Sequence, residues 1–370
     1  MAEEESIGRK KNLYWYTRYG RVEVEEQIFR LGRKGGEIRP FATSAEVKCR
    51  DYSQPLQRVL VDFGAEKSFV QAVERVREHY GIEVPASAVR QQSEAHGARM
   101  LEQQEKERLS ELGPEPGVEL LITEMDGSQV PLVETGVNSG GERFKDQRRG
   151  RRLHWQEARL CLAREPEKVT PRYGACLGEF EEAGAVWLDC VIRAGAGART
   201  HLHGVGDGAL WIAAQAKERF GEQATYLCDF YHVSEYLAAA AAPIAGTQAR
   251  PWLHWQQQLL KEDRLAEVLV ELAPKLEPPG VKDEEAPVRA CFRYLDNRRD
   301  QLDYRRAIQA GLPIGSGEIE SGHRSVIQER LKISGAWWLK QNARKMLALR
   351  VTRANGEWQS YWHHYSQAAA

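Results

Sequence analysis

A strand–helix–strand unit spans residues 200–237, which read THLHGVGDGALWIAAQAKERFGEQATYLCDFYHVSEYL. A short apolar run ends at Gly206-Asp207-Gly208, and a helix-like segment follows it. A second apolar run ends at Asp229, with His232 three residues later. Open α/β sheets place their ligands at the carboxyl ends of their strands. Asp207 and Asp229 are therefore candidate site residues.

The residues before this unit supply the rest of a sheet. Residues 118–134, VELLITEMDGSQVPLVE, predict two strands joined by a turn at Asp126-Gly127-Ser128, since Asp-Gly is a strong hairpin signal. Residues 155–163 predict a third strand and residues 177–194 an apolar helix. Three strands followed by alternating helix and strand predict an α/β fold with a ribonuclease-H-like domain.

The amino-terminal part predicts a different organisation. Residues 13–38 alternate as in two short strands with Gly20 at the turn. Helical periodicity then begins near residue 52, and a helix capped by Ser68 and ended by Gly81 precedes a second helix from about residue 85. Such a pair fits either a helix-turn-helix or an ordinary small bundle. In a helix-turn-helix, the second helix would present Arg90, Gln91, Gln92 and Ser93 to DNA.

After His232 the pattern is helical up to about residue 310, with breaks at Pro243 and Gly246. This pattern indicates a helical insertion in the sheet domain. We expect five segments: a β-like start (1–50), a helix-turn-helix-like region (51–112), the first part of the core (113–236), the insertion (237–310) and the completion of the core (311–370).

Charge and cysteine content narrow the class of protein. The 52 basic and 53 acidic residues give a net charge of −1, which by itself does not indicate a nucleic-acid partner. A basic surface that binds nucleic acid would therefore have to be local. The six cysteines are scattered and form no C-x-x-C pair, which argues against a zinc ribbon or a disulfide framework. The sequence has no long apolar run and no signal-like start, so we expect a cytoplasmic protein that does not enter a membrane.

Three acids stand out as metal-ligand candidates: Asp126, Asp207 and Glu320. Carboxylates gathered at sheet ends can hold two Mg²⁺ ions that act together in phosphoryl transfer. Each acid also has an ordinary interpretation, as a turn residue or a helix-cap residue. Asp229 rivals Asp207 for the second position, and we favour Asp207 because its flanking glycines permit close approach of a phosphate or metal.

Two further rivals remain. Glu318 competes with Glu320, and because two residues on a helix point about 200° apart, only one can face the metals. Asp62 is a rival first acid, although its neighbours predict a helix. His232 fits either a structural histidine or a residue beside the site, and Trp337 and Trp338 fit a core.

Four blocks of the sequence resemble the DDE transposases of prokaryotic insertion sequences, most closely the Kra type, which is related to the Mutator-like transposases. These blocks are VGDGALWI (205–212), CDFYHVSEYL (228–237), YLDNRRDQLDYRRAIQAGLPIGSGEIES (294–321) and RLKISGAWW (330–338). The resemblance implies a ribonuclease-H-like nuclease and strand-transferase that uses Mg²⁺ or Mn²⁺. It also implies that Asp126, Asp207 and Glu320 form the catalytic and metal-binding triad, with Asp229 and His232 as a supporting C/D-x-x-H signature.

The implied partner is double-stranded DNA, both the terminal inverted repeats and the target, held by a homodimer or a larger assembly near the nucleoid. Candidate DNA contacts are the basic or amide side chains Arg90, Gln91, Lys145, Arg148, Arg149, Arg151, Arg152, Arg298, Arg299, Arg330 and Lys332. For several of these, a solvated surface is the simpler interpretation. Two other functions stay open: a helix-turn-helix DNA-binding protein with an inactive core, and a nuclease without strand transfer.

Overall fold

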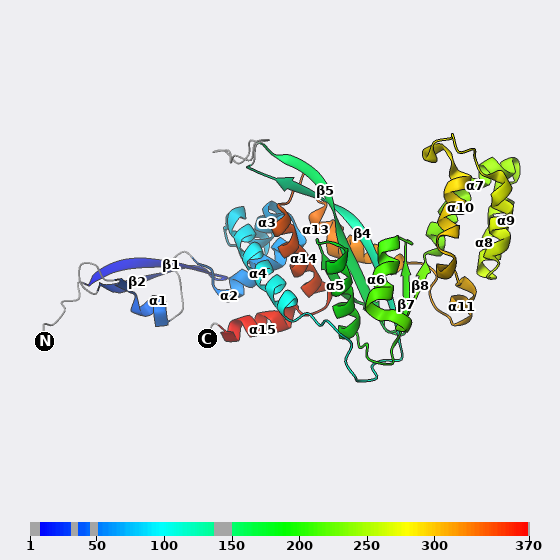
Figure 1. The fold of residues 1–370 in the computed structure, drawn as a ribbon. Coiled ribbons are helices and arrows are strands. Elements are labelled where there is room, and N and C mark those ends of the chain that lie inside the picture. Colours follow the sequence, from blue (N-terminus) through cyan, green and yellow to red (C-terminus); the bar gives the residue numbers. More distant parts are fainter. Residues whose placement is uncertain (1–7, 31–35, 45–50, 137–149, 369–370) are drawn as a thin grey trace. The chain divides into compact units, whose positions relative to one another are not determined.

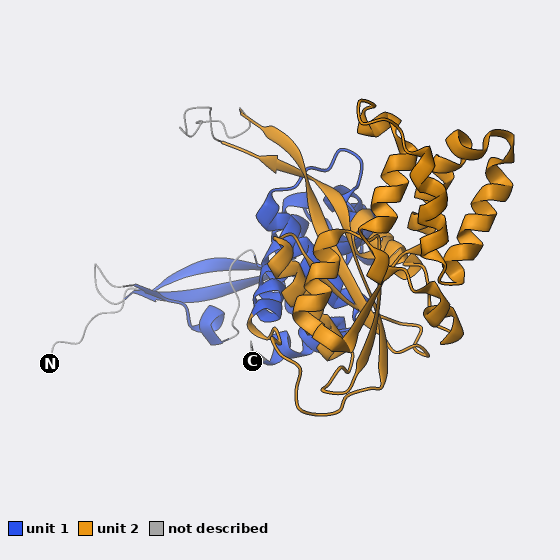
Figure 2. Cartoon of the chain, turned by 45° about the vertical axis from the view of Figure 1, so that its right-hand side comes forward, with its two compact units in different colours: residues 1–105, 329–370 blue, residues 106–328 orange. Residues whose placement is uncertain are grey.

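The chain, studied as a computed structural model, divides into two compact units (Figure 2). Unit 1 contains residues 1–105 and 329–370, and unit 2 contains residues 106–328. The structure describes residues 8–30, 36–44, 51–136 and 150–368. The sequence placed residues 311–370 together as the completion of the core, whereas the structure groups residues 329–370 with the amino-terminal helices.

Unit 1 begins with a β-hairpin. Strands β1 (Arg9–Thr17) and β2 (Gly20–Arg30) pair antiparallel, and the short β3 (Glu37–Ile38) pairs with β2 (Figure 1). Gly20, with φ of +111°, closes the turn as expected, because a positive φ suits glycine. A short helix, α1 (Pro40–Ser44), follows.

Three helices then pack around an apolar core: α2 (Gln54–Glu66), α3 (Phe69–Tyr80) and α4 (Ala86–Lys106). Ser68 caps α3 reciprocally with Gln71, and Gly81 ends it with φ of +65°, which confirms both predicted boundaries. The second predicted helix is α4, which continues without a break through Gly97. A Cβ at Gly97 would lie 2.7 Å from the Lys345 carbonyl oxygen, so this glycine permits close helix packing.

The carboxyl-terminal helices α14 (Lys340–Ala354) and α15 (Trp358–Ala368) complete unit 1. His96 of α4 is fully buried, with Nδ1 2.7 Å from the Tyr361 hydroxyl and Nε2 3.0 Å from Gln57 Oε1. Trp338 is buried, as expected of a core residue, whereas Trp337 is exposed.

Unit 2 contains a five-stranded mixed sheet in the order β6-β5-β4-β7-β8. Its strands are β4 (Leu120–Glu134), β5 (Arg152–Arg164), β6 (Arg172–Cys176), β7 (His201–Gly206) and β8 (Ala224–Cys228). The pairs β4–β5 and β5–β6 are antiparallel, whereas β4–β7 and β7–β8 are parallel. The α/β prediction is therefore confirmed at the level of a mixed sheet with helices.

The predicted turn at Asp126-Gly127-Ser128 is wrong. β4 passes through these residues as one strand of 15 residues, paired continuously with β5 from Ile122↔Arg164 to Glu134↔Arg152. Gly127 serves packing instead, because a Cβ there would lie 2.3 Å from Glu157 Oε1. β6, which the sequence analysis missed, restores the number of strands to five.

Helices cover both faces of this sheet. α5 (Phe180–Arg193) and α6 (Leu210–Phe220) pack on the face that carries Thr123 and Met125. Strand residues alternate between faces, so Glu124 and Asp126 face the other side. There, the short helix α12 (Gly317–Gly322) contacts β4 and β5.

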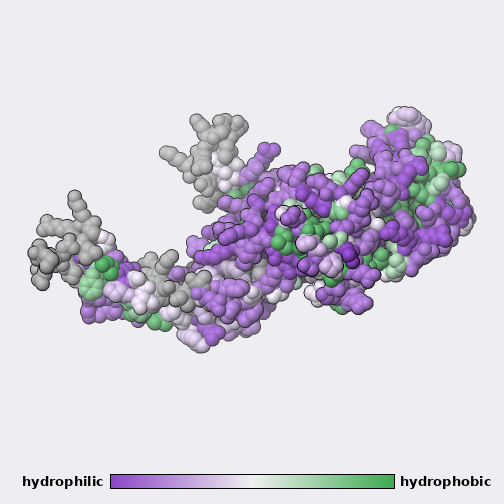
Figure 3. Space-filling model, turned by 60° about the horizontal axis from the view of Figure 1, so that its bottom comes forward, coloured by the Kyte–Doolittle hydropathy of each residue, from purple (hydrophilic) through white to green (hydrophobic). Residues whose placement is uncertain are grey.

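The insertion has its own apolar core and begins at Phe230, seven residues earlier than predicted. It contains α7 (Phe230–Ala245), α8 (Ala249–Lys261), α9 (Leu265–Leu272), α10 (Pro287–Asp296) and α11 (Tyr304–Gln309). α7 continues through Pro243 and ends before Gly246. Apolar residues lie among polar ones on the surface at the right-hand end of the view in Figure 3.

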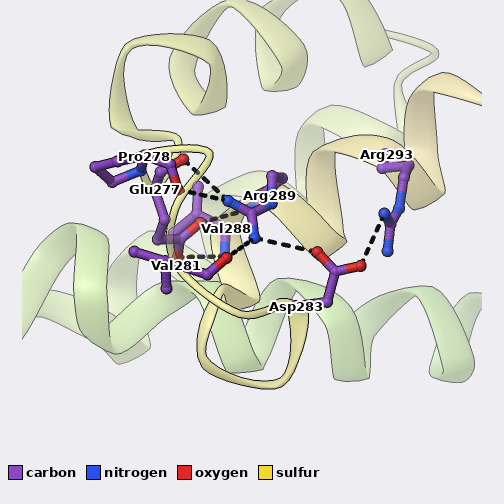
Figure 4. Close-up of polar contacts among 7 residues, drawn as sticks. All are labelled: Glu277, Pro278, Val281, Asp283, Val288, Arg289 and Arg293. Atoms are coloured by element: carbon purple, nitrogen blue, oxygen red, sulfur yellow. Dashed lines mark hydrogen bonds and ion pairs between the residues drawn. The ribbon is translucent and has the colours of Figure 1, made fainter.

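A polar network fixes the start of α10 (Figure 4). The Glu277 carboxylate accepts the backbone N–H groups of Val288 and Arg289 at 2.9 and 2.8 Å. The Arg289 guanidinium in turn donates to the Pro278 carbonyl and to Asp283. These bonds satisfy donors that a helix amino terminus leaves without partners and set the position of α10, which reaches the candidate site.

No helix among the described residues is long and apolar enough to cross a membrane.

Candidate functional site

Two of the predicted acids lie side by side on neighbouring strands. The parallel register of β4 and β7 runs from Leu120↔His201 to Glu124↔Val205, and two further residues bring Asp126 level with Asp207. Burial raises the pKa of the Asp207 carboxyl, and the Asp126 carboxylate raises it further. Both carboxylates therefore lie in one region, at the carboxyl end of β7.

The turn after β7 is held from the insertion. The Tyr294 hydroxyl on α10 donates to the Asp207 carbonyl oxygen at 2.7 Å, and Arg298 Nε donates to the Gly208 carbonyl oxygen at 2.6 Å. Gly208 has φ of +79°, and a Cβ there would lie 2.4 Å from the Tyr294 hydroxyl oxygen. The Asp207 side chain receives a bond from its own turn, Ala209 N–H to Oδ1 at 2.8 Å. The insertion thus fixes the backbone beneath this carboxylate.

The carboxylate of Asp229, the alternative second acid, accepts four hydrogen bonds. Its Oδ1 accepts the N–H groups of Tyr231 and His232, and its Oδ2 accepts the N–H and hydroxyl of Ser316. An ionised carboxylate has about four lone-pair sites, and Asp229 is 6% exposed. The residue therefore caps α7 and ties the segment before α12 to the sheet.

Two more strand residues hold α12 itself. Glu124 Oε2 on β4 accepts the Ile319 N–H at 2.7 Å, and burial raises the pKa of the Glu124 carboxyl to about 8. Arg164 on β5 makes a bidentate ion pair with Glu318. α12 is therefore fixed to the sheet by side chains that the sequence analysis either missed or assigned to other roles.

Glu320 differs from its rival Glu318. Glu318 is committed to Arg164, whereas Glu320 is exposed and its carboxylate makes no hydrogen bond or ion pair with any residue that the structure describes. Within the described ranges, no three His, Cys, Asp or Glu residues lie close enough together to hold a metal ion. The structure thus brings Asp126 and Asp207 together but leaves Glu320 outside that pair.

His323 is a neighbour of Asp126 that the sequence analysis did not single out. It begins a π-helical segment, His323–Gln328, and is 3% exposed. Its Nε2 lies 3.2 Å from Asp126 Oδ2, yet neither ring nitrogen has a hydrogen-bond partner among the described residues. π-Helical segments are frequent at functional sites. The available signal was its spacing, three residues after Glu320, which places both on nearby helix faces.

His232 lies near Asp207. It is in the first turn of α7, and its imidazole is close enough to lower the pKa of the Asp207 carboxyl. Its Nδ1 lies 3.6 Å from Glu235 Oε2. Asp62, the rival first acid, belongs to α2 of unit 1 and pairs with Arg353, so it lies outside the sheet.

The candidate DNA contacts fall into different environments. Arg90 and Gln91 are exposed on α4, but Ser93 is buried and donates to the Val89 carbonyl oxygen at 2.8 Å. Arg151, which precedes β5, and Arg152, its first residue, are exposed. Lys145, Arg148 and Arg149 lie outside the described residues.

The remaining cations include two with internal roles. Arg330 is 2% exposed, donates to the Gly64 carbonyl oxygen and lies over the rings of Phe69 and Trp338, and burial lowers its pKa to about 10. A phosphate cannot reach this guanidinium in the folded unit, so the predicted contact does not fit. Arg298 likewise supports the Asp207 turn. Arg299 is exposed and pairs with Asp296, and Lys332 is exposed.

Comparison with known proteins gives a family match and distant structural likenesses. None of the curated proteins matches the chain. A solved structure described as "Drosophila P element transposase strand transfer complex" is 8% identical, with a TM-score of 0.30 over 88% of this chain and 83% of that chain. A likeness of this degree carries no argument. A family model, in contrast, matches residues 46–364, and the chain therefore belongs to the Uncharacterised protein family (UPF0236).

Proposed function

We propose that this chain is a DDE transposase of the Kra type, which cleaves DNA at insertion-sequence ends and transfers the strand into target DNA. One observation carries the proposal: Asp126 on β4 lies level with Asp207, the residue that follows the adjacent parallel strand β7, and α12, which bears Glu320, is fixed over the face of β4 on which Asp126 lies. The four sequence blocks that resemble such transposases contain Asp207 and Glu320.

The strand order supports a ribonuclease-H-like core. Three antiparallel strands come first in the chain, and two parallel strands are added beside β4, the first of them. The helices between β8 and α12 would then be the insertion of this core. They separate Asp207 from Glu320 in sequence, while Ser316 and Ile319 hold α12 at the sheet.

The donor set fits a divalent metal in part. Carboxylate oxygens are the ligands that Mg²⁺ and Mn²⁺ prefer. Burial and then the neighbouring Asp126 carboxylate raise the pKa of the Asp207 carboxyl, and a bound cation would favour its charged form. Asp126 and Asp207 would hold the metal, with Glu320 as the third proposed ligand. Two such ions, when bound, stabilise the attacking and leaving oxygens of phosphoryl transfer.

The side chains around the acids would position them. Tyr294 and Arg298 fix the Asp207 turn, and Asp229, Glu124 and Arg164 fix α12. Water would attack the phosphorus at the transposon end and break the bond to the 3′ oxygen. The freed 3′-hydroxyl would then attack a phosphodiester of the target, losing its proton, forming a new ester bond to that phosphorus and displacing the 3′ oxygen of the target strand, which leaves as a hydroxyl. Holding two DNA ends requires at least two protomers.

The test is Mn²⁺-dependent cleavage of DNA that carries the inverted repeats flanking the coding sequence. Wild-type protein should nick at the repeat ends and join pre-cut ends to a plasmid, whereas Asp126→Asn, Asp207→Asn and Glu320→Gln should do neither. Cleavage that survives any of these substitutions contradicts the proposal. Cleavage without joining indicates a nuclease, and binding without cleavage indicates a DNA-binding protein.

A further inference from the structure

Unit 1 contains a pocket that the proposed chemistry does not use. It has a volume of about 680 Å³ and lies among α2, the end of α3, α14 and α15. Aromatic side chains (Phe63, Tyr80, Trp358, Trp362) and arginines (Arg18, Arg58, Arg353) line it. Its volume is within the usual range for small-molecule sites.

The aromatic lining offers ring faces to a ligand. Phe63 on α2 and Tyr80 at the end of α3 meet edge to face at 6.5 Å, and Tyr80 is 42% exposed. Trp358 on α15 lines the same pocket and packs edge-on against the buried Trp362 at 5.8 Å. The Arg353 guanidinium lies over the Trp358 ring, 4.9 Å from its centroid. Trp362 therefore supports Trp358, and a planar group would contact Tyr80 and the part of the half-buried Trp358 ring that Arg353 leaves uncovered.

The arginines leave positive charge beside these rings. Arg353 is neutralised by Asp62 and Glu66. Arg58, in contrast, donates to the neutral Gln359 amide oxygen at 2.7 Å, and Arg18 lies over the Tyr19 ring. Neither Arg58 nor Arg18 forms an ion pair with a carboxylate in the described part of the chain. A single acid, Asp62, faces three arginines in the lining.

We propose that this pocket binds one unpaired nucleotide of a DNA strand, with the base against Trp358 and Tyr80 and the phosphate at Arg58. Stacking on aromatic rings and charge-assisted bonds to phosphate are the two interactions that hold single-stranded nucleic acid. Exposed residues at the rim, Pro55, Gln359 and His363, leave room for the strand to continue. This inference rests on the proposed function only for the origin of the strand, a transposon end.

Fluorescence anisotropy of labelled oligothymidine with the full chain tests the proposal. Single-stranded DNA should bind more tightly than its duplex, and Trp358→Ala should weaken the single-strand affinity about tenfold, with most of it retained by Trp358→Phe. Tyr80→Ala, at an exposed position, gives a second reading if Trp358→Ala does not fold. Arg58→Glu should weaken binding far more than Arg75→Glu, a matched charge change at an exposed α3 position outside the pocket.

Equal losses for Arg58→Glu and Arg75→Glu, or full affinity in both aromatic variants, overturn the proposal. Thymidine monophosphate separates the two sources of a nucleotide. If the monophosphate quenches Trp358 fluorescence but the aromatic substitutions leave the oligonucleotide affinity unchanged, the pocket binds free nucleotides. The assignment to a DNA strand is then wrong. Asp207→Asn should abolish cleavage but retain oligonucleotide binding, so a failure of the proposed function is distinguishable from a failure of this one.

Discussion

An aspartate follows each of the parallel strands β7 and β8, but the two carboxylates differ in how many hydrogen bonds they accept. Asp207 and Asp229 each follow a parallel strand directly. Asp229 accepts four hydrogen bonds, whereas Asp207 accepts one, has a raised pKa and lies beside Asp126. The difference teaches that the number of donors already present, rather than position on the sheet, distinguishes a structural acid from a candidate ligand.

Two buried histidines repeat this contrast. His96 in unit 1 has partners for both ring nitrogens, and His323 in unit 2 has none by hydrogen-bond geometry within the described residues. Burial of a polar group without a partner costs about 1–3 kcal/mol. We infer that His96 stabilises unit 1 and that His323 is retained for its position beside Asp126.

Removal of the Asp207 carboxylate should have the largest effect on activity. Asp207→Asn should lower Mn²⁺-dependent cleavage on the order of a thousandfold, because a metal ligand stabilises the transition state by several kcal/mol. The melting temperature should stay close to that of the wild type. Calorimetry and the cleavage assay on the same variant provide the check. If Asp207→Asn is unfolded, Asp207 contributes to stability as Asp229 does, and the distinction between the two acids is wrong.

Substitution of Asp229 should act through stability instead. Asp229→Ala removes the cap of α7 and leaves the Ser316 donors buried without an acceptor, a loss of about 2–4 kcal/mol in the free energy of unfolding. Urea unfolding measures it, with Asp303→Ala, at the exposed cap of α11, as a milder control. A fully stable Asp229→Ala variant would show that the four bonds do not hold α12.

His323→Gln should weaken cleavage and Mn²⁺ affinity by about 10–100-fold, the usual effect of a residue that orients a metal ligand. The fold should persist, because no hydrogen bond of the imidazole to a described residue is lost. Exposed His364 offers a control substitution. Unchanged Mn²⁺ affinity in His323→Gln would assign the histidine to packing alone.

His96 should give the smallest effect, visible as a pH dependence. Burial lowers its pKa from 6.5 to about 3. Because the pKa of this imidazole is lower in the folded state than in the unfolded state, the folded protein has its full stability at pH values above the unfolded pKa. The stability falls as the pH drops below that value, since only the unfolded state then binds the proton. Between pH 6.5 and 5 the loss should be about 2 kcal/mol. Urea unfolding at both pH values, on wild type and His96→Gln, tests this, and an equal loss in both would contradict it.

Much of the fold could be predicted where local rules act alone. The caps Ser68 and Gly81 and the turn at Gly20 follow from backbone conformation and nearby donors. The turn at Asp126-Gly127-Ser128 could not be excluded, because continuous pairing with β5 overrides the Asp-Gly signal. β6 was missed because its sequence, RYGAC, contains a charged residue and a glycine, whereas β8, which is equally short, has the more apolar sequence ATYLC.

The site shows the same limit. The sequence predicted both Asp207 and Asp229 as candidate site residues. Only the structure shows which of their carboxylate oxygens already accept hydrogen bonds. Arg330 was a reasonable phosphate contact until its burial between Phe69 and Trp338 was seen. The spacing of His323 from Glu320 placed it near that acid on the helix, but its proximity to Asp126 depends on contacts between residues nearly 200 positions apart.

A titration of Mn²⁺, followed by electron paramagnetic resonance on wild-type protein, Asp207→Asn and Asp229→Asn, tests the central claim most directly. The account predicts that wild type binds Mn²⁺, that Asp207→Asn loses this binding while folded, and that Asp229→Asn keeps it wherever it is folded. Undiminished Mn²⁺ binding by folded Asp207→Asn would contradict the claim that this carboxylate is a metal ligand.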